Sequence, residues 1–98
     1  MKPTLKKKDF TAAAAGLKAL SHPARLSILC HLQEKEHTVN ELVQYTKMSQ
    51  SSVSQHLSKM KASNILTDRR DGNKVYYSIV EPKYEKLILA LCTIYSTK

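Results

Sequence analysis

A short helix with a polar but uncharged outer face is the feature that most constrains the fold of this chain. Val53, Leu57 and Met60 lie at positions i, i+4 and i+7, which places them on one apolar stripe, and Ser49 can cap the first turn. A solvated helix face normally carries Glu and Lys, whereas Ser is a mediocre helix former. The pattern predicts a helix held to the core on one side, whose other side contacts a polar partner or, as the alternative, only solvent. The side chains of this other side are Gln50, Ser51, Ser54, Gln55 and Ser58.

A second short helix is predicted just upstream. The stretch Thr38-Val39-Asn40-Glu41 fits a capping box, and the apolar spacing after it predicts an amphipathic helix that ends near Thr46. Lys47 and Met48 then leave room only for a tight turn. Two helices joined in this way form a helix-turn-helix, in which the second helix enters the major groove of DNA. Ser and Gln suit that position because they donate and accept hydrogen bonds at base edges and phosphates.

The segment after this pair of helices predicts a β-hairpin. Ile65 to Arg70 and Lys74 to Ile79 are β-prone runs that flank Asp71-Gly72-Asn73, and Asp-Gly between such runs is a strong hairpin signal. A hairpin directly after a recognition helix is a wing, which can hold phosphate or reach a minor groove. The candidate contact residues near its tip are Arg69, Arg70, Asn73 and Lys74.

Three more helices make the prediction mainly α with one small β-hairpin. The first runs from Phe10 to Leu20, opened by Asp9 or Thr11, and the second from Ala24 to Glu34, after a break that contains Pro23. The last begins at Pro82 and reaches Tyr95, and its apolar residues cover more of the circumference than one core face needs. We expect the surplus to be buried in a homodimer formed by the first and last helices. Two copies can bind a palindromic DNA site whose halves lie about one turn apart.

Positive charge is concentrated in two segments. The net charge is +8, from 16 Lys and Arg against 8 Asp and Glu. Residues 1–8 hold four lysines and no acid, and residues 47–74 hold six bases against Asp68 and Asp71, so the remainder is balanced. This distribution predicts a partner that is a polyanion, with Lys59 and the N-terminal lysines adding salt-dependent affinity. We expect residues 1–8 to be a basic flexible tail and residues 9–98 to form one domain for DNA binding and dimerisation.

The sequence gives little support for a membrane protein, a secreted protein or an enzyme. The apolar stretch from Ala12 to Leu17 is too short for a signal peptide or a membrane span, so we expect a cytoplasmic protein without membrane contact. The sequence contains no Ser/His/Asp arrangement, no Gly-rich phosphate loop and no paired carboxylates that would predict an enzyme or a bound cofactor. The distant alternative to DNA binding is a winged-helix module that binds another protein.

Three ordered stretches resemble the ArsR/SmtB family of winged helix-turn-helix repressors. They are Leu17 to Leu29, Ser49 to Leu57 and Arg69 to Ser78, and the resemblance extends from about residue 12 to residue 96. It implies a homodimeric bacterial repressor that releases its operator DNA when an inducer is sensed.

The metal sites familiar from this family have no counterpart here. Many members sense metals through Cys-x-Cys in or near the helix before the recognition helix, but Thr38 to Lys47 contains no Cys. Others use Asp and His on the last helix, and Pro82 to Lys98 contains neither. Thiolate and imidazole are the ligands that Zn²⁺ and similar ions need. We therefore expect no metal site of either kind.

The two cysteines are the remaining candidates for a sensor. Cys30 and Cys92 are expected on the second and last helices, where buried cysteines often serve only as small apolar residues. The chain also resembles a branch of the family that senses sulfide, persulfide or oxidants through one Cys on each of those helices. Ile28 to Leu32 matches that branch, but its second Cys tends to follow a Leu-Tyr-like pair, here Ile94-Tyr95. Cys92 lies one helical turn earlier on the same face, so a direct disulfide requires the two Cα atoms to approach within about 7 Å.

The histidines are expected to be structural or to contact DNA. His22 precedes Pro23 and should cap or pack, and His31 and His37 are isolated. His56 lies at the edge of the apolar stripe, where it can hydrogen-bond the turn or a phosphate. The closest alternative to a thiol switch is a repressor that either acts constitutively or senses a metal through an unfamiliar site.

Overall fold

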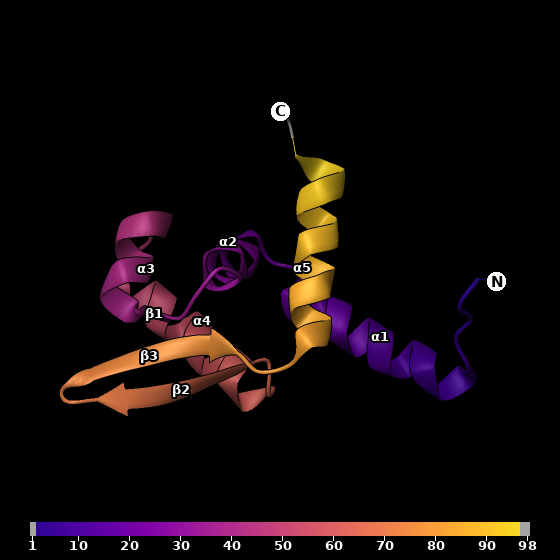
Figure 1. Cartoon of the computed structure of the whole chain (residues 1–98), viewed down its shortest axis with the longest axis horizontal. Coiled ribbons are helices and arrows are strands. Elements are labelled where there is room, and N and C mark those ends of the chain that lie inside the picture. Colours follow the sequence, from indigo (N-terminus) through magenta and orange to yellow (C-terminus); the bar gives the residue numbers. More distant parts are fainter. Residues whose placement is uncertain (1, 97–98) are drawn as a thin grey trace.

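Helices make up most of the chain, and a small sheet lies at one end of the molecule (Figure 1). The structure is a computed structural model that describes residues 2–96. The sheet is antiparallel, with the strand order β1-β3-β2. The elements are α1 (Lys7–Leu20), α2 (Pro23–Leu32), β1 (His37–Thr38), α3 (Val39–Thr46), α4 (Gln50–Ala62), β2 (Leu66–Asp71), β3 (Lys74–Ile79) and α5 (Pro82–Tyr95). The mainly α fold with a β-hairpin is thus confirmed.

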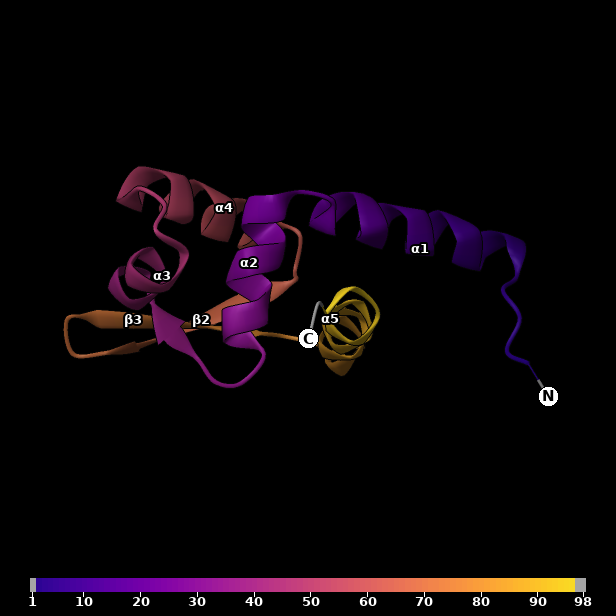
Figure 2. The same ribbon diagram turned by 90° about the horizontal axis from the view of Figure 1, so that it is seen from above.

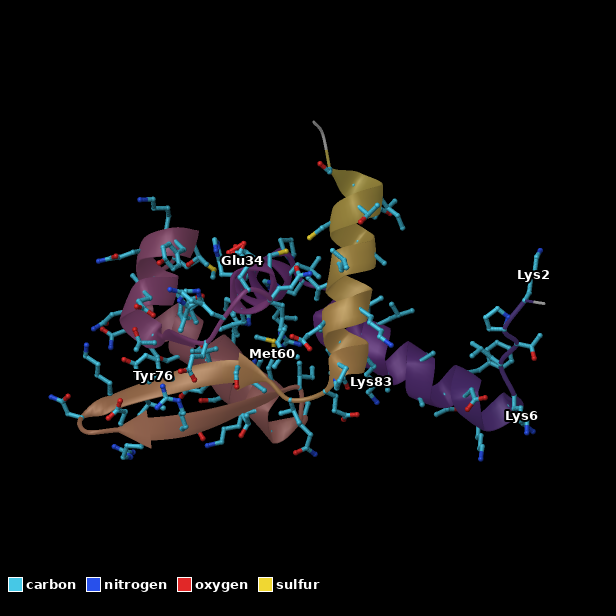
Figure 3. All side chains as sticks on the ribbon, in the orientation of Figure 1. Lys2, Lys6, Glu34, Met60, Tyr76 and Lys83 are labelled. Atoms are coloured by element: carbon cyan, nitrogen blue, oxygen red, sulfur yellow. The ribbon has the colours of Figure 1, made fainter. Side chains whose placement is uncertain are left out.

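The core forms around α2, which lies between the α3–α4 pair and α5 (Figure 2). Ile28 and Leu29 of α2 are completely buried, and Ile88 is the buried residue of α5. Met60 of α4 lies near the middle of the molecule, whereas Lys2 and Lys6 lie at the far end of the N-terminal segment (Figure 3). Apolar burial of this kind is the main stabilising contribution to folding. The other buried apolar residues are Leu20, Leu32, Leu42, Val53, Leu57, Ile65 and Leu66.

The predicted helix-turn-helix is confirmed, together with its capping signals. Thr38 Oγ1 accepts a hydrogen bond from the amide of Glu41 at 3.2 Å, and the Glu41 carboxylate accepts one from the amide of Thr38 at 3.0 Å. Lys47 adopts a left-handed backbone conformation with φ of 64°, which ends α3 and turns the chain sharply toward α4.

The predicted hairpin is confirmed with small changes at its ends. Asp71 pairs with Lys74, so only Gly72 and Asn73 form the turn. Gly72 has φ of +65° and stands at the position that type II′ hairpin turns reserve for glycine. The sequence did not indicate β1, whose residues His37 and Thr38 pair with Tyr77 and Tyr76 of β3. A strand of two residues is too short to show a period of two.

Two predicted helix ends differ from the structure. α1 begins at Lys7 instead of Phe10, because the Asp9 carboxylate accepts a hydrogen bond from the amide of Lys6 at 2.9 Å and so supports an earlier start. Lys7 and Lys8 therefore lie in the helix. α2 ends at Leu32, two residues before Glu34, because the chain must turn there to bring His37 into the sheet.

α1 projects away from the other elements (Figures 1 and 2). Leu20, its last residue, is its only buried one, whereas Phe10 and Leu17 are 59% and 55% exposed. Within the described part of the chain, no helix combines the length and apolar character needed to cross a membrane.

Candidate nucleic-acid interface and thiol pair

α4 is held so that its polar side faces outward. Ser49 caps the helix by accepting a hydrogen bond from the amide of Ser52 at 3.1 Å, as predicted. Val53, Leu57 and Met60 are at most 1% exposed and fix the inner side. We call the opposite side the outer face of α4; of its residues, Gln50, Ser51, Gln55 and Ser58 are exposed, and Ser54 is half-buried.

The tip of the wing carries side chains that are open to solvent. Arg70, Asn73 and Lys74 are exposed, and Arg70 and Lys74 make no ion pair within residues 2–96. Asn73 and Lys74 also line a polar hollow of about 400 Å³ together with Gln50, the first residue of α4. The wing tip and the start of the outer face of α4 are therefore neighbours. This arrangement can contact bases and backbone of one duplex together.

Arg69 is occupied by a contact within the chain. Its Nε donates to both carboxylate oxygens of Glu36, at 2.9 and 3.0 Å, and its Nη2 donates to the same carboxylate. The guanidinium carbon lies 4.6 Å from the ring centroid of Tyr76. The hydrogen bond from Arg69 lowers the pKa of Glu36. Arg69 thus ties the wing to the segment before β1, a role that sequence reasoning missed, because no local pattern links positions 33 residues apart.

His56 of α4 contacts the start of α2. Its Nδ1 accepts a hydrogen bond from Nε of Arg25 at 3.4 Å, and its ring centroid lies 4.8 Å from that of His22. Burial is the main cause that lowers the pKa of His56, and the nearby positive charges of Arg25 and Lys59 lower it further. His22 caps α2, as expected, because its Nδ1 accepts from the amide of Ala24 at 3.1 Å.

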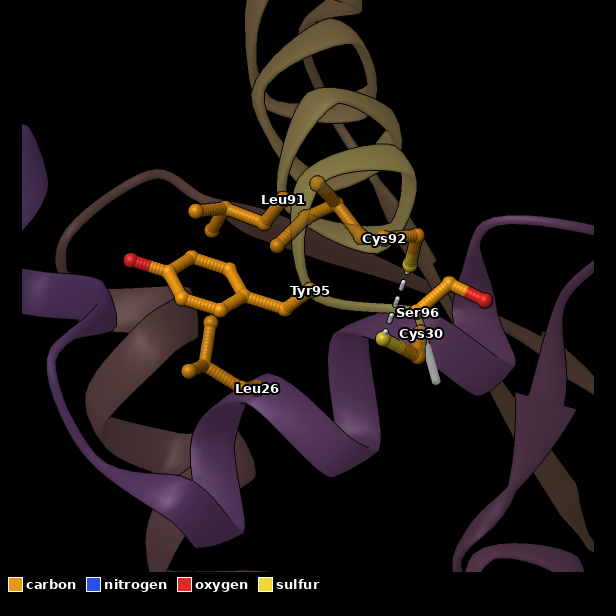
Figure 4. Close-up of a pocket in the computed structure, with 7 residues that line it drawn as sticks. Leu26, Cys30, Leu91, Cys92, Tyr95 and Ser96 are labelled. Carbon is orange, nitrogen blue, oxygen red and sulfur yellow. Dashed lines mark hydrogen bonds between the residues drawn. The ribbon is translucent and has the colours of Figure 1, made fainter. Parts of the chain in front are cut away.

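The two cysteines are brought together from helices that are distant in sequence. The sulfur atoms of Cys30 on α2 and Cys92 on α5 are 3.6 Å apart, although the residues are 62 positions apart. Figure 4 shows both sulfurs at one end of a groove, with Leu26, Leu91 and Tyr95 along it. The groove has a volume of about 500 Å³, and its other lining residues are Ile88 and Ser96. Cys92, one turn before the position suggested by the family pattern, is therefore the residue that faces Cys30.

The surroundings of the thiol pair keep Cys30 protonated. Partial burial against the apolar groove raises the pKa of Cys30 to about 11, and the contact with Cys92 contributes to the rise. Both side chains nevertheless remain accessible from solvent. Within residues 2–96, no group of three or more His, Cys, Asp or Glu side chains could hold a metal ion.

The comparisons with known proteins agree with this geometry. Residues 22–68 match the family described as bacterial regulatory protein, arsR family. The chain is 41% identical over 93 residues to the nodulation protein NolR of Rhizobium meliloti, a match that covers 95% of this chain and 76% of NolR. The chain belongs to the arsR family of bacterial transcription regulators.

Two more known proteins are similar along most of the chain. The biofilm growth-associated repressor of Xylella fastidiosa (strain Temecula1 / ATCC 700964) is 40% identical over 82 residues, which are 84% of this chain and 72% of that repressor. The crystal structure of the predicted DNA-binding transcriptional regulator from E. coli superposes with a TM-score of 0.87 at 37% identity, covering 91% of this chain and 95% of that one. The chain is thus a DNA-binding transcription regulator with a winged-helix fold.

Proposed function

We propose that this protein is a dimeric repressor that releases its operator DNA when Cys30 and Cys92 are oxidised. The proposal depends above all on one observation, the 3.6 Å separation of the two sulfur atoms across the α2–α5 contact. Two thiols at this distance need an approach of only about 1.5 Å to reach the bond length of a disulfide.

The oxidant can be a peroxide or a persulfide, and the chemistry balances for either. With hydrogen peroxide, one thiol becomes a sulfenic acid with loss of water, and the second thiol displaces a second water to form the disulfide. With an organic persulfide, Cys92 attacks as the thiolate, takes the outer sulfur and releases the organic thiol. The second thiol then displaces that sulfur as hydrogen sulfide, which closes the disulfide.

The activity that oxidation would regulate is the binding of α4 in the major groove of DNA. We assign base contacts to Gln50, Ser51, Ser54 and Gln55, which lie on the outer face of α4. The wing contact comes from Arg70, Asn73 and Lys74, with Arg69 holding the hairpin in place through Glu36. Lys59 and the N-terminal lysines add electrostatic affinity, and His56 supports α4 through its contact with Arg25.

Dimerisation would use α1 and α5, whose apolar side chains remain uncovered in one chain. Phe10 and Leu17 of α1 and Leu89, Ile94 and Tyr95 of α5 are each more than half exposed. A groove of about 440 Å³ also runs between the two helices, lined mainly by small and apolar side chains. Apolar surface of this kind on a small domain favours association with a second copy. Two copies would present two α4 helices to the two halves of a palindromic operator.

A disulfide would couple the proposed dimer interface to the DNA-contacting helix α4. It would fix α2, which packs against α3 and α4, to α5, which belongs to the proposed dimer interface. Any shift of α5 then alters the spacing of the two α4 helices. A good pairing between a side chain and a base contributes about 1–3 kcal/mol, so a displacement that breaks a few such pairings is enough to release DNA.

Gel shifts with a duplex that the wild-type protein selects from a random pool test the proposal. The reduced protein, Cys30→Ser and Cys92→Ser should all bind this duplex. Peroxide or persulfide should release DNA only from the wild type, and a reductant should restore binding. If both variants still release the duplex on oxidation, the thiol switch is wrong and the protein is a repressor of another kind. Size-exclusion chromatography with light scattering tests the dimer, which a monomeric mass at micromolar concentration would contradict.

A further inference from the structure

A hollow with basic walls lies where α1, α2 and α4 meet. Its volume is about 730 Å³. Lys18 comes from the end of α1, His22 and Arg25 from the start of α2, and Lys59 from the last turns of α4. The remaining lining residues are small or carry a hydroxyl, and no acid is among them: Ala15, Ala19, Ser21, Ala62 and Ser63. We call this feature the basic hollow.

The cations of the basic hollow have no acidic partner within residues 2–96. None of Lys18, Arg25 and Lys59 forms an ion pair in the part of the chain that the structure describes. Lys61, close by on α4, differs, because its Nζ lies 2.8 Å from Asp68. Three cationic side chains and a histidine therefore share one concavity without a carboxylate.

Hydrogen bonds hold two donors of the basic hollow, Arg25 and His22, in position. Arg25 donates from Nη1 to the carbonyl of Ala19 at 2.9 Å and from Nε to His56, which holds its guanidinium while Nη2 keeps its N–H groups for a ligand. Nδ1 of His22 accepts from the amide of Ala24, so Nε2 carries the ring proton and can donate. Lys18 and Lys59 are exposed and can close over an anion from two sides.

The positive potential extends to the neighbouring residue. His56 contacts Arg25 and His22, and the charges of Arg25 and Lys59 lower its pKa in addition to the effect of burial. Like charges that act on one ring indicate a local field that favours an anion.

The basic hollow continues the outer face of α4. Lys59 follows Gln55 by four residues, and Ala62 follows Ser58 by four, so each lies one turn further along the same side of the helix. The wing tip adjoins the other end of this face, at Gln50. A helix of 13 residues is about 20 Å long, which exceeds the roughly 12 Å width of the major groove. When α4 lies in the groove, its two ends can therefore reach the backbones that border it.

We infer that the basic hollow binds a phosphate of the DNA backbone, on the opposite end of α4 from the wing. The inference rests on the proposed DNA contact of the outer face of α4. It adds Lys18, His22 and Arg25 to the DNA-binding residues. Phosphate is the ligand that fits, because its oxygens accept charge-assisted hydrogen bonds from guanidinium, ammonium and imidazole groups at once. The wing and the basic hollow then hold the duplex from both sides of the groove.

Lys18→Gln tests this inference, because Lys18 is exposed and makes no ion pair within residues 2–96. Lys86→Gln on α5 is the matched control, since it removes the same charge from an exposed helix position outside the basic hollow. Fluorescence anisotropy measures the affinity for the selected duplex and for a scrambled duplex between 50 and 300 mM KCl. Circular dichroism and the urea midpoint check that both variants fold.

The expected result is specific to a phosphate contact. Lys18→Gln should reduce the slope of log affinity against log salt by about 0.9 for each protomer, or about 1.8 for the proposed dimer, which is an affinity loss of about sixtyfold at 0.1 M salt. The loss should be equal for both duplexes, because phosphates carry no sequence information. Lys86→Gln should leave the slope unchanged.

Four other results would overturn the inference. An unchanged slope for Lys18→Gln, while the wild type binds DNA, would refute the basic hollow and leave the proposed function intact. A loss confined to the selected duplex would assign Lys18 to base recognition. Inorganic phosphate can also be titrated against the DNA-free protein and followed by NMR. If phosphate binds the wild type but not Lys18→Gln, while Lys18→Gln leaves the slope of log DNA affinity against log salt unchanged, the basic hollow is a site for free anions. A wild-type protein that binds neither duplex would refute the proposed function together with this inference.

Discussion

A disulfide between Cys30 and Cys92 should stabilise the folded chain strongly. The bond would close a loop between residues 62 positions apart, because the sulfurs already lie 3.6 Å from each other. Loop-closure entropy for that separation amounts to about 4 kcal/mol at 25 °C in the chain-entropy description. Some of this is offset by the shift of about 1.5 Å that joins the sulfurs.

The strain of that shift should be small because the end of α5 is loosely packed. Ile88 is the buried residue of α5, and it lies one turn before Cys92. The groove beside the thiol pair also leaves room for Leu91 and Tyr95 to move. We therefore expect a net gain of about 2–4 kcal/mol, which raises the melting temperature of a domain of this size by about 10 °C or more.

Urea unfolding followed by circular dichroism measures this gain. The oxidised and reduced forms are compared at one protein concentration, because association also contributes to stability. Mass spectrometry confirms that the disulfide lies within one chain, and Cys92→Ser treated with the same oxidant is the control. An intramolecular disulfide that leaves the urea midpoint unchanged or lowers it would refute the geometry on which the thiol switch depends. So would oxidation that only crosslinks one chain to another.

Three further predictions follow from individual contacts. Leu57→Ala should lower the free energy of unfolding by about 2–5 kcal/mol, because Leu57 is completely buried in the core, and a loss below 1 kcal/mol in urea would contradict that packing. Thr38→Ala removes the α3 cap and should cost about 1 kcal/mol; the test is whether the urea midpoint falls relative to wild type. The lowered pKa of His56 means that folding favours its neutral form, so the stability it contributes is complete above pH 6.5 and is lost as the pH falls below that value. From pH 7.5 to 5.5, the wild type should therefore lose more stability than His56→Gln, and equal losses would show that His56 is not the titrating group.

Local signals made the helix-turn-helix and the hairpin predictable. Ser49, the Thr38–Glu41 box and the hairpin turn at Gly72 each fix a boundary through hydrogen bonds or backbone angles within a few residues, and the structure confirms all three. The stripe of Val53, Leu57 and Met60 likewise determines which side of α4 is buried. β1 gave no such signal, and Asp9 did give one for α1 but was expected to open the helix, whereas it lies in the first turn.

Contacts between distant segments could not be predicted from the sequence. The Glu36–Arg69 pair and the Arg25–His56 contact join positions 33 and 31 residues apart, and any acid or base could in principle have been the partner. The basic hollow likewise exists only because the ends of α1, α2 and α4 converge. Their separate lysines and arginine have no spacing that predicts it.

The thiol pair depends on both the sequence and the tertiary structure. The sequence by itself determined that two cysteines lie on two helices, and it predicted that α4 and the wing bind a polyanion. Only the tertiary structure decided that Cys92 faces Cys30, because the crossing of α2 and α5 selects which turn of α5 lies against α2. Helix periodicity fixes the side on which a residue lies, whereas the packing of one helix on another fixes the level at which two residues meet.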